Sequence, residues 1–110
     1  MKAHARREGP CHVVVIEGSA DVAASARLRE VLLGTLDTGA MKIVCDLSAT
    51  DFICSDALGV LITAYLKVHG RGGFLRLANP QPRLRELFRT TRLDHLFDVF
   101  PDVASAVAKA

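Results

Sequence analysis

The stretch from Lys42 to Val68 reads KIVCDLSATDFICSDALGVLITAYLKV. Its first six residues, Lys42 to Leu47, are β-branched at the centre, which predicts a buried strand. From Asp56 to Val68 the apolar residues recur at helical spacing, which predicts a helix. The main apolar stripe of that helix comprises Leu58, Leu61, Ile62 and Tyr65. A strand that leads into a helix is a building unit of layered α/β domains.

The same alternation precedes this stretch. Residues 13–16 form a short β-branched run that ends before Gly18, which predicts another buried strand. Residues 22–36 carry apolar side chains on one helical face, with Asp21 placed to cap the start and Gly39 just past the end. We therefore expect a second strand and helix pair here.

The alternation also continues after the central stretch. The glycine cluster at 70–73 lacks the Walker pattern and follows a helix, so we expect a turn there and no phosphate site. The later elements are a strand over 74–77, a helix opening at Pro82, a strand over 96–100 and a helix starting at Pro101 and Asp102. Alternating strands and helices predict an α/β fold, in one domain over residues 1–110.

The composition narrows the function. Half of the 110 residues are hydrophobic and 24% are charged, which is typical of a globular chain and argues against disorder. A net charge of +2 is too small to favour nucleic-acid binding. The longest apolar run, Ala57 to Leu66, is too short to span a membrane, and because the first residues lack the pattern of a secretory leader, we do not expect secretion. We expect a cytoplasmic protein.

The cysteines and histidines do not indicate a metal site. Three cysteines without a CxxC pair form no disulfide framework, and Cys45 is expected to pack as a small hydrophobe. The four histidines show no metal-ligand spacing, so neither a metal nor a cofactor is expected.

The segment from Asp46 to Leu61 resembles the central signature of the STAS domain, as found in bacterial anti-sigma factor antagonists. In that family a strand ending in Asp-Leu leads through an aspartate and a serine into a helix. Three more segments resemble family turns and strands in the same order, namely Glu17–Val22, Gly72–Pro80 and Leu93–Phe97. The resemblance covers nearly the whole chain and implies a single-layer mixed β-sheet with helices packed mainly on one face.

The resemblance implies a binding switch and no enzymatic activity. Family members bind an anti-sigma factor that is also a serine kinase, and so release a sigma factor for transcription. The kinase phosphorylates the serine at the helix start, and a phosphatase reverses this. Ser55 matches that serine. A phosphate there would be tolerated by the helix N-terminus while adding roughly −1.5 to −2 charge to a docking surface. The alternative is that Ser55 is an ordinary helix N-cap.

Three residues at this site depart from the family pattern. Cys54 stands where the family usually has aspartate, Asp56 where it has Ser, Thr or Ala, and Ala57 where it has glycine. A phosphate on Ser55 would lie about 6 Å from the Asp56 carboxylate, and repulsion would cost from ~1 to ~5 kcal/mol depending on the dielectric. We therefore expect Ser55 to be a poor phosphoryl acceptor, or Asp56 to imitate the modified state in part.

The predicted partner contacts lie around this helix start. They are Asp21, Cys54, Ser55, Asp56, Ala57, Leu58 and Gly59. Asp21 is equally a candidate helix cap. Arginines 83, 85, 89 and 92 favour a solvated helix face over a contact for an acidic partner, and Arg92 replaces a glycine that the family often carries.

Two alternatives remain. Within the same fold, the chain would be a phosphorylation-independent regulatory subunit of a transporter or stress-signalling complex. From another class, a redox sensor or small enzyme would use the thiol of Cys54, which precedes a helix N-terminus. Neither a base nor an oxyanion motif accompanies that thiol in the sequence.

Overall fold

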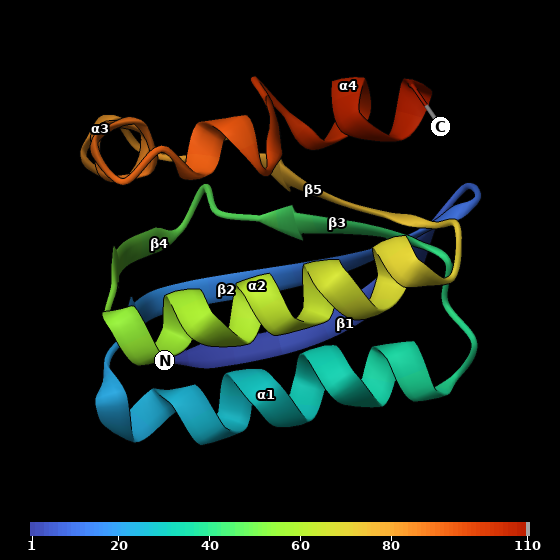
Figure 1. Ribbon diagram of the computed structural model, residues 1–110, viewed down its shortest axis with the longest axis horizontal. Coiled ribbons are helices and arrows are strands. Elements are labelled where there is room, and N and C mark those ends of the chain that lie inside the picture. The colour runs from blue at the N-terminus through green and yellow to red at the C-terminus, as the bar shows by residue number, and fades with distance from the viewer. Residues whose placement is uncertain (110) are drawn as a thin grey trace.

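The computed structural model describes residues 1–109 (Figure 1). Its elements, in chain order, are β1 (Lys2–Glu8), β2 (Cys11–Ala20), α1 (Val22–Asp37), β3 (Lys42–Asp46), β4 (Thr50–Ile53), α2 (Ser55–Gly70), β5 (Phe74–Ala78), α3 (Pro82–Thr90), a 3₁₀ turn (Leu93–His95), β6 (Asp98–Phe100) and α4 (Val103–Ala108). The strands and helices expected from the sequence are present, and β1 and β4 are added to them.

One mixed sheet organises the chain. The strand order is β1-β2-β3-β5-β6, and β4 continues the sheet by pairing with the far end of β2 beyond a shift in register after Gly18. Only β1 is antiparallel to its neighbour; the other pairs are parallel, as helical crossovers require. The α/β fold with a single-layer mixed sheet is therefore confirmed.

Alternation along β2 separates the core into two parts. Val14 and Ile16 face α1 and α2, which cover one face of the sheet, whereas Val13 faces the other side. On that other side α4 supplies Ala106. In Figure 1, α2 lies in front of β1 and β2, α1 runs alongside it below the strands, and α3 and α4 lie at the top of the view. Both α1 and α2 begin at the same end of the molecule, at the left in Figure 1.

The buried face of α2 differs from the predicted stripe. Leu61 is fully buried as expected, but Leu58, Ile62 and Tyr65 are only half-buried, and Leu66 is 59% exposed. The buried residues of α2 are Ala57, Val60, Leu61, Ala64 and Val68. Alanine side chains on this face let α2 lie close to both the sheet and α1, so the larger side chains are displaced toward its outer side.

The glycine cluster after α2 forms the expected turn. Gly72 has a φ of +85°, which favours glycine. A Cβ on Gly73 would overlap the carbonyl oxygen of Met41, because the chain from α2 passes directly against the start of β3 before entering β5. These glycines serve the turn between α2 and β5.

Candidate functional site

The starts of α1 and α2 are brought together by two neighbouring strand ends. β2 and β4 run parallel, and their last residues, Ala20 and Ile53, are paired in register. Asp21 and Cys54 follow them and each begins a helix. The amide of Cys54 donates to the carbonyl of Ala20 at 2.9 Å, which ties the two strand-to-helix junctions together.

Cys54, and not Ser55, is the N-cap of α2. Its backbone is extended, and its sulfur accepts a hydrogen bond from the amide of Ala57 at 3.4 Å. The hydroxyl oxygen of Ser25 on α1 lies 3.7 Å from the same sulfur. The interpretation of Ser55 as the N-cap is therefore wrong: a half-buried thiol has that role, one residue earlier in the chain.

Ser55 is the first residue of α2 and is exposed to solvent. Among the described residues, no hydrogen bond engages its hydroxyl group. Asp56 follows it in the first turn and is exposed as well. A helix leaves its first amide groups without intrahelical acceptors, so this surface combines a free hydroxyl, unsatisfied amides and one carboxylate.

Asp21 has the capping role expected from the sequence. Its carboxylate accepts from the amide of Ala24 at 2.9 Å, and its carbonyl accepts from the hydroxyl of Ser25 at 3.1 Å. Asp21 is nevertheless exposed and lies beside the start of α2 through the contact of Ser25 with Cys54. A contact between Asp21 and a partner stays a prediction.

The remaining predicted contacts differ in accessibility. Gly59 is exposed, with no atom within 4 Å of the place that a Cβ would take, and Leu58 is half-buried. Ala57 is fully buried beneath the first turn of α2, so its side chain does not reach the surface. The methyl group of Ala57 therefore supports the first turn of α2 from within the core and cannot contact a partner directly.

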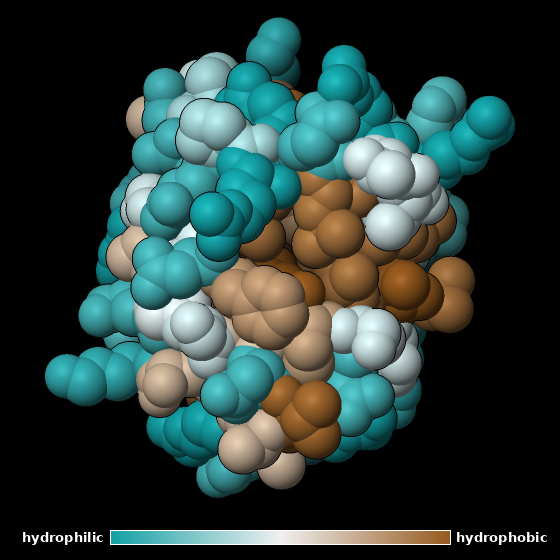
Figure 2. Space-filling view, turned by 90° about the vertical axis from the view of Figure 1, so that its left-hand side faces the viewer, coloured by the Kyte–Doolittle hydropathy of each residue, from teal (hydrophilic) through white to brown (hydrophobic). Residues whose placement is uncertain are grey.

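Apolar side chains that the sequence analysis did not select lie around these residues. Phe52 on β4 is 47% exposed and Val22 at the start of α1 is 67% exposed. Figure 2 faces this end of the molecule and shows an apolar area bordered by hydrophilic side chains. We call the exposed residues here the junction face; they are Asp21, Val22, Phe52, Ser55, Asp56 and Gly59. Short strand β4, absent from the prediction, is what places Phe52 on it.

A shallow hollow of about 400 Å³ separates α1 from α2 next to Ser55. It is lined by Ser25, Ala26 and Arg29 of α1 and by Ser55, Asp56, Gly59, Val60 and Thr63 of α2. Arg29 is the only cation among these side chains, and sequence reasoning missed it. The one feature of the sequence that points to Arg29 is its position two helical turns after the Asp21 cap.

A second hollow adjoins the junction face. It is lined by Phe52 of β4 and by Arg83, Leu84, Glu86, Leu87 and Thr90 of α3. It is mostly apolar, and it extends the accessible apolar surface from β4 onto α3. The arginines of α3 and of the following turn are all exposed, as a solvated helix face would be.

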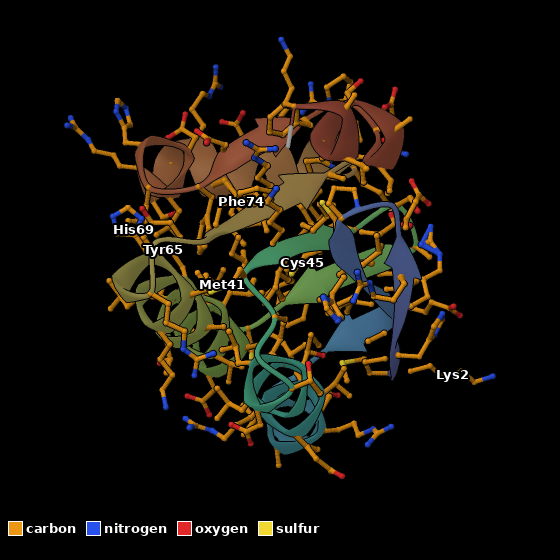
Figure 3. The ribbon with its side chains drawn as sticks, turned by 90° about the vertical axis from the view of Figure 1, so that its right-hand side faces the viewer. Lys2, Met41, Cys45, Tyr65, His69 and Phe74 are labelled. Carbon is orange, nitrogen blue, oxygen red and sulfur yellow. The ribbon has the colours of Figure 1, made fainter. Side chains whose placement is uncertain are left out.

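The cysteines occupy different environments. Cys45 lies inside the sheet, where Figure 3 labels it between the helical layer and the outer strands. Burial, with a smaller contribution from Asp46, raises the pKa of Cys45 to about 12, so this cysteine packs as the expected small hydrophobe. Burial also raises the pKa of the Cys11 thiol. Within residues 1–109, no cluster of three or more metal-ligating side chains occurs.

Arg92 has an uncommon backbone conformation. Its φ is +61° and its ψ is +21°, the left-handed region that favours glycine. Arg92, which departs from the family's glycine, thus takes a backbone conformation that glycine adopts more readily. Among the helices of residues 1–109, none is both long and apolar enough to cross a bilayer.

Comparisons with known proteins agree with this architecture. The STAS domain family matches residues 2–106. The anti-sigma-B factor antagonist of Bacillus subtilis is 35% identical to this chain over 86 residues, which is 78% of each protein.

Two solved structures have the same fold. An anti-sigma factor antagonist from Mycobacterium paratuberculosis superposes with a TM-score of 0.90 at 23% identity, covering 98% of this chain and 92% of that one. The Bacillus cell fate determinant SpoIIAA in its phosphorylated form gives a TM-score of 0.76 at 18% identity and covers 98% of both chains. With the family match extending over nearly every residue, this chain belongs to the STAS domain family.

Proposed function

We propose that this chain is an anti-sigma factor antagonist that binds its anti-sigma factor through the junction face. The proposal takes its partner class from the relative that is 35% identical over most of both chains and is named an anti-sigma-B factor antagonist. The junction face supports it physically, because exposed Phe52 and Val22 offer apolar area beside polar groups that fix orientation. Binding releases the sigma factor that the anti-sigma factor holds.

The regulatory half of the proposal concerns Ser55. The anti-sigma factor is of the serine-kinase type and transfers the γ-phosphoryl group of ATP to the Ser55 oxygen, with release of ADP and a proton. A serine phosphatase hydrolyses the ester and restores the hydroxyl. The observation that carries this proposal is the accessibility of Ser55: its hydroxyl is exposed, and no protein group competes for it within the described residues.

Charge explains how the modification would act. A phosphate on Ser55 brings roughly −1.5 to −2 charge to a surface that the partner must cover and desolvate. Cys54, and not Ser55, holds the helix start, so the modification leaves the cap of α2 in place. The fold therefore persists in both states, and the affinity for the partner changes.

Asp56 lowers the readiness of Ser55 to accept a phosphoryl group. Both side chains are exposed, so the water-like end of the repulsion range applies, about 1 kcal/mol between the Asp56 carboxylate and a phosphate of roughly −1.5 to −2 charge at about 6 Å. That cost slows the modification without preventing it. The same carboxylate places a permanent negative charge on the junction face, and Asp56→Ser should strengthen partner binding.

The proposal is tested in two steps. The tagged chain is purified from its native cells, and the anti-sigma factor that accompanies it is identified by mass spectrometry and then produced in pure form. Calorimetric titration measures its affinity for the wild type, Gly59→Arg and Ala104→Glu. Gly59→Arg places a large side chain on the junction face, whereas Ala104 is an exposed residue of α4 on the other side of the sheet.

We expect Gly59→Arg to weaken binding at least about tenfold and Ala104→Glu to leave it unchanged. Equal affinities for all three proteins would refute the junction face as the contact surface. A membrane transporter that binds in place of an anti-sigma factor would support the transporter-subunit alternative. Intact mass after incubation with the partner and ATP reports phosphate on Ser55 directly.

A further inference from the structure

Arg29 is an arginine without a carboxylate partner beside the modifiable serine. It lines the hollow between α1 and α2 together with Ser55 and Asp56. No ion pair among residues 1–109 engages Arg29, although Arg27, two residues earlier on the same helix, pairs with Glu30 at 3.3 Å. The side chain of Arg29 is therefore free to accept an anion in this hollow.

Two other side-chain donors in the hollow are already engaged. The hydroxyl of Ser25 donates to the carbonyl of Asp21 at 3.1 Å, and the hydroxyl of Thr63 donates to the carbonyl of Gly59 at 2.9 Å. Apart from Ser55 itself, the guanidinium of Arg29 is therefore the side chain lining the hollow that still has unengaged hydrogen-bond donors. The amide of Ala57 is likewise engaged, because it donates to the sulfur of Cys54.

We propose that Arg29 receives the phosphoryl group when Ser55 is phosphorylated and is thus a positioning residue of the switch. This inference rests on the proposed function, because it takes Ser55 as the modified residue. The planar guanidinium can donate two parallel hydrogen bonds to two phosphoryl oxygens, which fixes the group as well as neutralising it. The phosphoryl group is then held across the hollow, between α2 and α1.

The arrangement also bears on Asp56. The charged side chains that line the hollow with Ser55 are Asp56 on α2 and Arg29 on α1, and the capping carboxylate of Asp21 lies at the neighbouring start of α1. Two carboxylates disfavour a dianionic phosphate, and Arg29 opposes them. The cation on α1 therefore makes a modified serine compatible with the aspartate that this chain has next to it.

The test uses the chain with phosphoserine incorporated at position 55 during translation, so it needs no kinase. Phosphorus NMR follows the second ionisation of the phosphate, whose pKa is about 6 for an isolated phosphoserine. The titration is run on the otherwise unchanged chain, on Arg29→Gln and on Arg27→Gln. The last variant is the matched control, because it removes the same charge from the same helix outside the hollow.

We expect Arg29→Gln to raise this pKa by roughly 0.8 unit, because a guanidinium in hydrogen-bond contact with the phosphate, about 4 Å from the phosphorus, favours the dianion by that much in water-like dielectric. Arg27→Gln should change it by less than about 0.1 unit. Circular dichroism checks that each variant is folded. Equal shifts in the two variants would overturn the proposal, as would no shift in Arg29→Gln.

The two proposals fail in different ways. If phosphoserine at position 55 leaves the anti-sigma factor bound while Arg29→Gln still raises the phosphate pKa, the proposed function is wrong and the placement of Arg29 is correct. If the phosphate weakens partner binding and Arg29→Gln does not alter its pKa, the switch is correct and Arg29 has no part in it.

Discussion

Replacing Cys54 by alanine should destabilise the protein more than replacing Ser55 by alanine. The expectation follows from the geometry of the helix start, where the sulfur of Cys54 accepts the amide of Ala57 at 3.4 Å. The Ser55 side chain, by contrast, is exposed at the first helical position. A serine at the start of a helix would ordinarily be assigned as the cap. The two variants therefore show whether Cys54 or Ser55 caps α2.

The magnitude for Cys54→Ala has two parts. Removal of an N-cap costs about 0.5–2 kcal/mol, and the weak acceptor strength of sulfur places this cap near the lower end. Loss of a half-buried sulfur atom from its contacts adds on the order of 0.5 kcal/mol. The sum is about 1 kcal/mol. Ser55→Ala should stay within about 0.5 kcal/mol of the wild type, because alanine is a good helix former and no hydrogen bond is lost among the described residues.

Urea denaturation, followed by circular dichroism at neutral pH and with a reductant present, measures both changes. Cys54→Asp provides a rescue, because a carboxylate accepts the same amide more strongly and favours the helix N-terminus. We expect Cys54→Asp to recover most of the stability lost in Cys54→Ala. If Ser55→Ala were the more destabilising substitution, the Ser55 hydroxyl would be the helix cap. It would then not be free to accept a phosphoryl group, as the proposed function requires.

Three further predictions concern positions away from this helix start. Arg92→Gly should raise the free energy of unfolding by roughly 0.5–1 kcal/mol. Glycine removes the strain of the φ of +61°, which is about 1–2 kcal/mol, but part of that gain is lost because glycine makes the unfolded chain more flexible. Thermal unfolding at an unchanged or lower temperature would contradict this. Arg76 donates hydrogen bonds to the carbonyls of Ala106 and Lys109 at 2.8 and 3.3 Å. Arg76→Lys should therefore lower the free energy of unfolding by roughly 1–2 kcal/mol, measured by urea denaturation, and speed amide exchange in α4. Unaltered exchange would argue against the contact. At pH 8 a thiol reagent should modify Cys54 alone before denaturant is added, because Cys11 and Cys45 are buried and burial raises the pKa of both thiols, to about 12 for Cys45. Rapid labelling of Cys11 or Cys45 would show that the sheet opens readily.

The sequence predicted the elements whose hydrophobic period is strong. β3 and α2 follow from the run of residues 42–68, because β-branched residues and helical spacing act in the same direction there. β1 was missed because its residues Lys2–Glu8 are mostly exposed and polar, and such an edge strand has little apolar pattern. β4 was missed because four residues are too few to show a period.

The sequence predicted which segment of the chain is accessible better than it predicted which residue caps the helix. The family resemblance located Ser55 and its neighbours, and that segment does lie on an accessible face. Which residue caps α2 depends on a shift of one position at the helix start, and a sequence pattern does not resolve that. Arg29 could not be selected either, because only the packing of α1 against α2 brings it beside Ser55.

Affinity for the anti-sigma factor, measured by titration calorimetry with serine or phosphoserine at position 55, tests the central claim most directly. The account predicts that phosphoserine weakens binding at least about tenfold while the urea midpoint of the chain alone stays nearly unchanged. Equal affinities for the two forms would contradict it, because charge on the exposed start of α2 would then have no control over the partner.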